Sequence, residues 1–132
     1  MFDAPSPFAA LIGLQITALS KTEVRAELRV REALLNVNGV LHGGAIMALA
    51  DIMGGSGTMA SISAEQRTTT VESKTSFLRA LKAGTTVQAV STPLHQGGKT
   101  EVWQTNIYDE NNRLAAQVTQ TQIILEPRPE AS

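Results

Sequence analysis

Apolar and polar residues alternate in several short stretches of the chain, and this alternation indicates β-strands with one buried face. Within Glu23–Val30, valine, alanine and leucine occupy the even positions and charged residues the odd ones. Together with Leu14–Ser20 this stretch predicts a hairpin with one solvated face, joined near Lys21-Thr22. Beyond Gln66 the pattern predicts four further strands: Thr68–Leu78, Thr85–Leu94, Glu101–Asp109 and Arg113–Leu125.

Short polar turns separate these four strands. They are Lys82–Gly84, Gln96–Lys99 and Glu110–Asn112, and each is short enough to join antiparallel neighbours. The turns therefore predict that the last four strands pair in the order in which they occur in the chain.

Helical periodicity appears in two places. Near the start, Phe8–Ile12 fits one or two turns, with Ser6 as the cap, Pro7 as the first helical residue and Gly13 as the stop. After the turn-forming residues of a loop at 31–41, apolar residues recur at helical spacing and predict one central helix from about Gly43 to Ser61. This helix is apolar nearly all round, which predicts burial on most sides.

The element order indicates the architecture. Two strands, one long helix and four strands leave too few helices for parallel crossovers, so the sheet should be antiparallel and curl around the helix. We expect one domain over residues 1–132, with residues 126–132 forming a polar, proline-containing, disordered tail.

Composition narrows the class of protein. The chain of 132 residues is 42% hydrophobic, has a net charge of -1 and contains no cysteine. These values fit a globular protein, argue against a nucleic-acid partner and exclude disulfides and thiolate chemistry. The sequence shows no secretory signal and no apolar run long enough to cross a membrane, so we expect a cytoplasmic protein.

Several familiar sites are disfavoured. With only His42 and His95 in the chain, a metal centre has no supporting ligand spacing. Ser56 lacks the flanking glycine two residues later that a nucleophile elbow needs, because that position is Thr58. The segment Gly98–Thr100 resembles the end of a P-loop, but the first glycine of that motif is replaced by proline and no helix follows. This segment is therefore interpreted as a surface turn, and its Lys99 side chain could still contact a ligand phosphate.

The segment His42-Gly43-Gly44 and the acid Asp51 form the sharper constellation. Backbone N–H groups at the start of a helix lack intrahelical partners, so those of the two glycines could stabilise negative charge on a ligand carbonyl. The alternative is merely a glycine-rich helix start. Asp51 lies in an otherwise apolar helix, where a lone buried carboxylate is costly, which makes it a catalytic candidate or else a structurally hydrogen-bonded acid.

The glycines after Asp51 also need an explanation, because each mid-helix glycine costs about 1 kcal/mol relative to alanine. Gly54 and Gly55 lie on the same helix face as Asp51. They leave room for a substrate or a second subunit, or they allow tight packing against strands. Both interpretations stay open at this point.

Asn36 and the segment VNGVLHGGAIMALAD, which ends at Asp51, resemble the hotdog-fold acyl-CoA thioesterases of the phenylacetic-acid-pathway and 4-hydroxybenzoyl-CoA (Arthrobacter-type) group. The segments TTTVESKTSFLRAL and PLHQGGKTEVWQTNIYDENNRLAAQVTQTQIIL are similar to later strands of that family, especially in 1,4-dihydroxy-2-naphthoyl-CoA thioesterases. The resemblance covers about Leu34 to Leu125. It implies an α+β hotdog fold, a long central helix wrapped by a curved antiparallel sheet of about six strands.

The resemblance also implies roles. Asp51 would be the general base or the nucleophile, the Gly43 N–H would polarise the thioester carbonyl, and Asn36 and His42 would position water or substrate. Sites in this family combine two subunits, and its members are dimers of dimers, so a homo-oligomer is expected. Five residues are similar to positions near the CoA pantetheine and phosphates: Arg79, His95, Gly97, Gly98 and Lys99.

One position departs from the family pattern. Relatives often carry Ser or Thr four residues after the acid, where this chain has Gly55. Thr69 or Thr70 is the alternative source of a hydroxyl group. The leading interpretation is an acyl-CoA thioesterase for an aromatic or medium-chain substrate, without metal or organic cofactor. The alternatives are a hydroxyacyl-thioester dehydratase of the same fold, which would want a histidine paired with the helix acid, and a non-catalytic acyl-CoA-binding protein.

Overall fold

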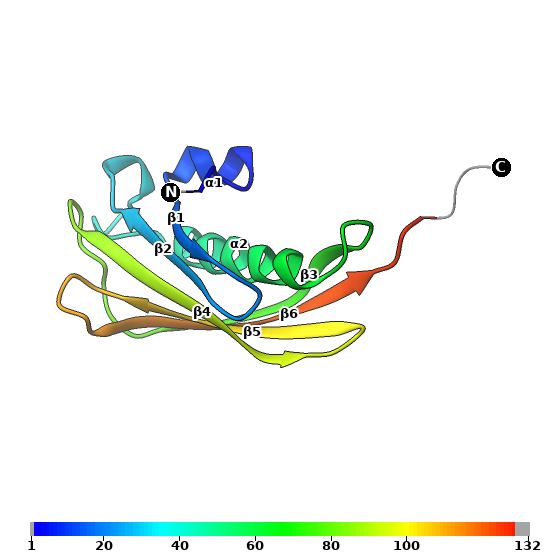
Figure 1. Ribbon diagram of the computed structural model, residues 1–132. Helices are drawn as coiled ribbons and strands as arrows, with labels where there is room; N and C mark the ends of the chain where they lie inside the picture. Colours follow the sequence, from blue (N-terminus) through cyan, green and yellow to red (C-terminus); the bar gives the residue numbers. More distant parts are fainter. Residues whose placement is uncertain (1, 129–132) are drawn as a thin grey trace.

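The computed structural model describes residues 2–128 and shows a long helix on the concave side of a curved antiparallel sheet (Figure 1). The predicted element order is confirmed. In chain order the elements are α1 (Pro7–Ile12), β1 (Gln15–Leu19), β2 (Val24–Arg29), a 3-10 turn (Glu32–Leu34), α2 (Gly43–Ser61), β3 (Arg67–Phe77), β4 (Thr86–Gln96), β5 (Thr100–Tyr108) and β6 (Leu114–Leu125). The 3-10 turn lies in the segment predicted as a loop. Of the predicted disordered tail, residues 129–132 lie outside the described residues.

Helix α1 begins and ends where its capping residues predict. The Ser6 side chain accepts a hydrogen bond from the Ala9 N–H at 3.1 Å, and Pro7 is the first helical residue. Gly13 ends the helix with a left-handed φ of 79°, a conformation that glycine adopts without steric cost.

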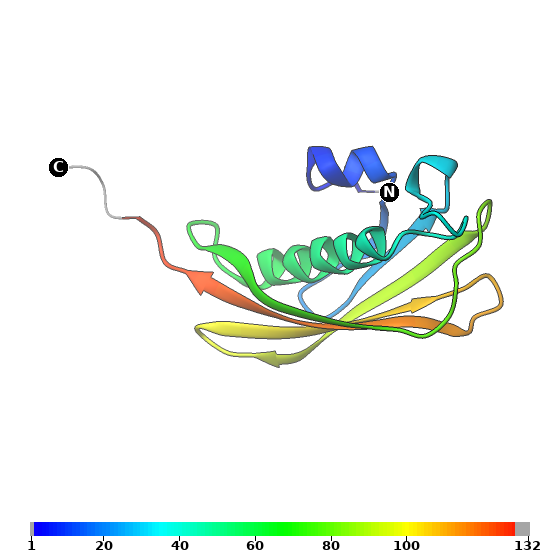
Figure 2. The ribbon, with the colours of Figure 1, turned by 180° about the vertical axis from the view of Figure 1, so that it is seen from behind.

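The six strands run in the spatial order β1-β2-β4-β5-β6-β3. The predicted pairings β1–β2, β4–β5 and β5–β6 are confirmed, but the expected pairing of β3 with β4 is wrong. Strand β3 instead pairs with β6, from Arg67 opposite Leu125 to Phe77 opposite Ala116, and β4 pairs with β2 (Figure 2). A short turn is compatible with a hairpin but does not require one, because pairing is decided by which strands must cover the helix.

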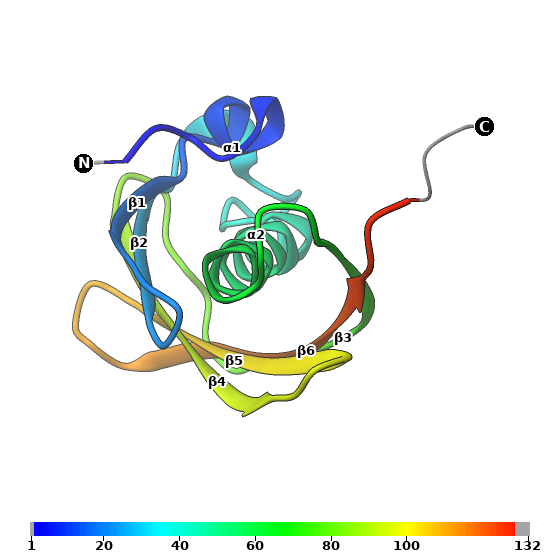
Figure 3. The ribbon, with the colours of Figure 1, turned by 45° about the vertical axis from the view of Figure 1, so that its right-hand side comes forward.

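The connection between β3 and β4 shows how the chain makes this crossing. It passes the start of α2, where the Leu41 N–H donates to the Leu81 carbonyl at 2.9 Å, and Leu81 is buried. With β3 at one edge and the β1–β2 hairpin at the other, the sheet covers both flanks of α2 (Figure 3).

The core lies between α2 and the sheet. Ile46, Leu49, Ala50 and Met53 are buried on the sheet side of the helix. They belong to the same buried cluster as large side chains on the central strands, including Trp103, Ile107 and Val118. This packing accounts for most of the helix's apolar periodicity.

The opposite face of α2 is open in this single chain, so the prediction of burial on most sides is wrong for it. Met47 and Met59 are 41% and 52% exposed. On strand β3, at the adjacent edge of the sheet, Val71 and Phe77 are each more than half exposed. One six-stranded sheet curls around only part of a helix, which leaves this apolar face uncovered.

Among residues 2–128, no helix is both long enough and apolar enough to cross a membrane.

Candidate active site

The start of α2 carries the His42-Gly43-Gly44 segment. His42 caps the helix, because its Nδ1 atom accepts a hydrogen bond from the Gly44 N–H at 2.8 Å. The N–H groups of Ala45 and Ile46 donate to the His42 carbonyl. Within residues 2–128 the Gly43 N–H has no hydrogen-bond acceptor. It is therefore a donor available to a ligand.

Gly43 lines a pocket of about 440 Å³ between the start of α2 and the segment that follows β3. A Cβ atom at Gly43 would lie 3.2 Å from the Phe77 ring, so a larger residue would crowd this pocket. Asn36 and Arg79 line the same pocket. The structure thus brings together three of the residues that sequence reasoning selected.

Asn36 has a structural contact as well. Its Oδ1 atom accepts hydrogen bonds from the Asn38 N–H at 2.9 Å and the Val40 N–H at 3.3 Å, which shapes the loop before α2. The side-chain oxygen is occupied, and the amide NH₂ group is the end that can donate to water or a carbonyl.

Asp51 lies in the middle of α2 and is exposed in the single chain. The sequence-based expectation of a buried carboxylate is wrong here, because Asp51 belongs to the outward face of the helix. Its Oδ1 atom accepts a hydrogen bond from the Thr70 hydroxyl of β3 at 2.5 Å. Thr70, rather than Thr69, is therefore the neighbouring hydroxyl.

A second pocket, of about 880 Å³, opens beside Asp51. It lies between the outer face of α2, the first half of β3 and the N-terminal segment. Most of its lining surface is apolar, although seven of the thirteen lining residues carry a hydroxyl, carboxylate or amide group. The lining residues are Pro5, Ser6, Leu19, Asp51, Ile52, Gly55, Ser56, Met59, Ala60, Thr68, Thr69, Thr70 and Gln122. Such a lining suits an apolar group bearing a few polar atoms.

The glycines after Asp51 divide between the two interpretations left open by the sequence. A methyl group at Gly54 would overlap the Gln120 side chain, so this glycine allows close packing of α2 on β6. Gly55 has nothing within 4 Å of the position of a Cβ atom and lines the pocket beside Asp51. Gly55 therefore leaves room for a ligand or a second chain.

Gly43 and Asp51 are eight residues apart on one straight helix. At a rise of about 1.5 Å per residue, their separation along the axis is about 12 Å. A single carbonyl group in contact with the Gly43 N–H therefore lies out of reach of the Asp51 carboxylate of the same chain. The structure does not bring these two predicted residues together within one chain.

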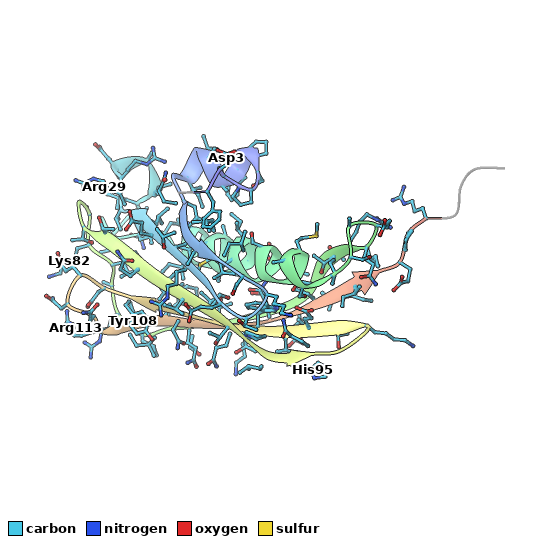
Figure 4. The ribbon with its side chains drawn as sticks, in the orientation of Figure 1. Asp3, Arg29, Lys82, His95, Tyr108 and Arg113 are labelled. Atoms are coloured by element: carbon cyan, nitrogen blue, oxygen red, sulfur yellow. The ribbon has the colours of Figure 1, made fainter. Side chains whose placement is uncertain are left out.

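The residues expected near CoA also fall into two groups. Arg79 lies near the start of α2, where its N–H donates to the Ala115 carbonyl at the beginning of β6. His95, Gly97, Gly98 and Lys99 lie at the β4–β5 turn, where the Lys99 carbonyl accepts from the Ile124 N–H near the end of β6. Figure 4 shows His95 and Lys82, which lies three residues after Arg79, toward opposite ends of the sheet. The Arg79 group contacts β6 at Ala115 and the β4–β5 turn contacts it at Ile124. These positions are nine residue steps apart, which corresponds to about 30 Å along the strand.

Sequence reasoning missed two side chains beneath the Asp51–Thr70 pair. Gln122 of β6 is buried, and its Nε2 atom donates to Thr70 Oγ1 at 2.5 Å. Thr68 Oγ1 lies 2.9 Å from Gln122 Oε1. The available signal was glutamine at alternate positions, 120 and 122, which places both on the inward face of a strand otherwise buried by apolar residues.

Residues 2–128 contain no group of three His, Asp or Glu side chains that could bind a metal ion.

A family model described as the thioesterase superfamily matches residues 38–116, which include Gly43, Asp51, Thr70 and Arg79. The chain belongs to this superfamily. It is therefore a thioester hydrolase of the hotdog fold, as the sequence resemblance implied.

Individual relatives agree with this assignment. The Mycobacterium tuberculosis protein Rv1847 is 32% identical over 126 residues, covering 93% of this chain and 89% of that protein. Its solved structure aligns with a TM-score of 0.89 over 94% of this chain and 100% of that one. The 1,4-dihydroxy-2-naphthoyl-CoA hydrolase of Listeria monocytogenes is 31% identical over 103 residues, covering 78% of this chain and 83% of that enzyme.

Proposed function

We propose that this protein hydrolyses acyl-CoA thioesters to a free acid and CoA, with Asp51 as the catalytic carboxylate. The observation that carries the proposal is the Asp51 carboxylate, held by the Thr70 hydroxyl at the rim of the 880 Å³ pocket on the open face of α2. As general base, Asp51 removes a proton from water that attacks the thioester carbonyl. As nucleophile, it attacks that carbonyl itself and displaces the CoA thiolate, and water then hydrolyses the resulting mixed anhydride to the free acid and the regenerated Asp51 carboxylate.

The developing oxyanion needs a hydrogen-bond donor, and the Gly43 N–H is the proposed one. It stands at the positive end of the α2 dipole and lacks an acceptor within the described residues. Because Gly43 has no side chain, a carbonyl oxygen that enters the pocket can approach the backbone closely. Asn36 and His42 are proposed to position water or substrate from the same end of the helix.

Because Gly43 and Asp51 lie about 12 Å apart along one helix, we propose that each site combines the Gly43 of one chain with the Asp51 of another. The exposed apolar face of α2 and the exposed edge strand β3 support assembly of two copies, since both leave apolar side chains and backbone groups unpartnered. A dimer of dimers is the proposed assembly. The two separated groups of CoA-binding candidates, at Arg79 and at His95–Lys99, would then serve one CoA molecule from two chains.

The acyl group is proposed to be aromatic or medium-chain. A pocket of about 880 Å³ is large enough for either, and its mostly apolar lining favours both over a short polar acid. Relatives from Escherichia coli and Listeria monocytogenes are named 1,4-dihydroxy-2-naphthoyl-CoA hydrolase, which supports the aromatic choice. Water, a carboxylate and a backbone donor suffice for this reaction, so the proposal includes no metal or organic cofactor.

Thiol release from a panel of aryl-, phenylacetyl- and straight-chain acyl-CoAs tests the activity. We expect turnover of at least one aromatic or medium-chain substrate. This activity should persist after the protein is treated with EDTA. Retained acyl-CoA binding with no thiol released from any panel member would contradict the proposal and favour a non-catalytic binding protein.

Mixing two inactive variants tests the shared site. Asp51→Asn chains and Gly43→Val chains, unfolded together and refolded, should form hybrid pairs in which one of the two sites has both native groups. With random pairing this restores about a quarter of the wild-type activity, whereas sites built within single chains would restore none. Sedimentation showing an active monomer would equally contradict the shared site.

A further inference from the structure

A line of hydrogen-bonded side chains leads from the sheet interior to the proposed catalytic carboxylate. It runs from Thr68 to Gln122, from Gln122 to Thr70 and from Thr70 to Asp51, with oxygen or nitrogen separations of 2.9, 2.5 and 2.5 Å. From it we infer that Gln122, oriented by Thr68, is a positioning residue that sets the direction of the Thr70 hydroxyl and thereby the orientation of the Asp51 carboxylate. This inference rests on the proposed function of Asp51.

The chemistry of the groups fixes the direction of each hydrogen bond. An ionised carboxylate can only accept hydrogen bonds, so the Thr70 hydroxyl must donate its single proton to Asp51 Oδ1. In its other hydrogen bond, Thr70 Oγ1 must therefore be the acceptor. The NH₂ end of the Gln122 amide must face Thr70 to donate that bond. The carbonyl end of that amide consequently faces Thr68, whose single hydroxyl proton is shared between Gln122 Oε1 at 2.9 Å and the Ile123 carbonyl at 3.0 Å.

The opposite amide orientation is unfavourable. If the Gln122 carbonyl faced Thr70, the Thr70 proton would be drawn to that carbonyl, and two oxygen acceptors would face each other 2.5 Å apart at Asp51. Gln122 is buried, so it has no access to bulk water that could replace either partner. Burial therefore holds the amide in the orientation that supplies Asp51 with a donor.

The backbone of β3 contributes to the same arrangement. The register of β3 against β6 shifts between Thr70 and Glu72, so the ladder is irregular at the residue that follows Thr70. Such bulges redirect neighbouring side chains. At this edge strand the redirected hydroxyl lies against α2, where the family's more usual hydroxyl position is Gly55.

The consequence for catalysis is a carboxylate with one committed and one free oxygen. Oδ1 is occupied by Thr70, whereas within residues 2–128 Oδ2 has no hydrogen-bond partner. Oδ2 is therefore the atom that addresses water or the thioester. When the substitutions keep the volume of the pocket, loss of the line should lower kcat through misorientation of this atom rather than raise KM.

A double-mutant cycle tests the inference. Gln122→Met keeps the side-chain length and removes both hydrogen bonds, and Thr70→Val removes the hydroxyl with little change of shape. Thr70→Val removes a hydrogen bond to a charged group, so we expect it to lower kcat about tenfold with an unchanged KM. Gln122→Met removes hydrogen bonds to neutral hydroxyl groups and acts through Thr70, so its loss of kcat should be no larger. In the Thr70→Val background, Gln122→Met should cause no further loss, because Gln122 acts through Thr70.

Gln117→Met is the matched control. Gln117 lies on the same strand and donates to Asn106 Oδ1 at 2.9 Å, away from Asp51. It should leave kcat unchanged. If Gln122→Met lowers kcat by the same factor in both backgrounds, raises only KM or has no effect, the inference is wrong.

A second pair of variants keeps the test decisive should Gln122→Met fail to fold. Thr68→Val should lower kcat severalfold, and Thr68→Ser, which restores the hydroxyl, should recover it. Equal kcat values for these two variants would overturn the inference. A wild-type protein that releases no thiol would contradict the proposed function and this inference together, whereas normal Gln122 and Thr68 variants beside an impaired Asp51→Asn contradict the inference alone.

Discussion

On the side of α2 that faces the sheet, Gly54 and Gly57 lie against Gln120 and Trp103, and a methyl group at either glycine would overlap those side chains. On the outward side, one residue from Gly54, Gly55 has no atom within 4 Å of the position of a Cβ. Each glycine costs the helix about 1 kcal/mol relative to alanine. The inner two offset this cost through close packing of the core, and the outer one leaves space beside Asp51.

The side chains around these glycines show the same division. The inner face of α2 carries Leu49 and Met53, which are fully enclosed, and the outer face carries Asp51 and Met59, which are exposed. Residues on the inner face should therefore affect stability, and residues on the outer face should affect activity and assembly. Matched substitutions on the two faces separate these two kinds of effect.

The largest effect is expected on the outer face. Asp51→Asn keeps the shape of the side chain and removes the proposed base or nucleophile, so kcat should fall by about 100-fold or more. The melting temperature and CoA binding should stay close to those of the wild type. Steady-state thiol release and thermal unfolding measure both, and near-normal kcat would remove Asp51 from the mechanism.

On the inner face, Gly57→Ala forces a methyl group against the buried Trp103 ring. Overpacking of this kind should lower the free energy of unfolding by about 1–3 kcal/mol, measured by urea titration. An unchanged midpoint would show that the helix can move away from β5 without penalty, and the division between the faces would fail.

Gly55→Ala is the matched substitution on the outer face. The methyl group enters open space, so the gain in helix propensity should raise the free energy of unfolding by up to about 1 kcal/mol. The same methyl narrows the pocket beside Asp51, and KM for the preferred acyl-CoA should rise. Destabilisation by Gly57→Ala together with stabilisation by Gly55→Ala would support the difference between the inner and outer faces of α2. A destabilised Gly55→Ala variant would contradict it.

A charge outside both faces provides the smallest expected effect. At the β5–β6 turn, Asp109 accepts hydrogen bonds from the backbone N–H groups of Arg113 and Asn111 and from Arg113 Nε. These donors, the Arg113 backbone N–H foremost, hold the pKa of the Asp109 carboxyl below its usual value of 3.8. Because the folded pKa is the lower one, the stabilisation is complete above about pH 5, where the carboxyl is ionised in both states, and is lost as the pH falls through the folded pKa.

Asp109→Asn removes this titration. From pH 4 downward, the wild type should therefore lose slightly more stability than the variant, which urea unfolding at a series of pH values measures. Above pH 5 the difference between the two proteins should be constant. A parallel loss in both proteins below pH 4 would mean that the turn makes no contribution to acid sensitivity.

Local patterns were sufficient to predict most of the elements. Ser6, Pro7 and Gly13 fixed the bounds of α1, because caps and stops act within a few residues. The bounds of α2, Gly43–Ser61, coincide with the prediction, since a glycine pair precedes its apolar periodicity and polar residues follow it. Thr70 was also a candidate from its sequence position, although its contact with Asp51 needed the pairing of β3 beside α2.

Features that depend on distant segments were beyond local pattern. The pairing of β3 with β6 rather than β4 follows from how the sheet curls around α2, a constraint that no turn encodes. The exposure of Asp51 and the contrasting surroundings of Gly54 and Gly55 depend on the rotation of the helix against the sheet.

The sequence by itself determined the strands, the two helices, three of the strand pairings and the identity of the residues with candidate chemistry, because these depend on propensity, periodicity and resemblance. Only the tertiary structure decided which face of α2 is open, that Gly43 and Asp51 lie two helical turns apart, and that Gln122 lies beneath Thr70. The physical reason is that a hydrogen bond between residues 52 positions apart, such as that of Gln122 with Thr70, exists only after the whole sheet has closed around the helix.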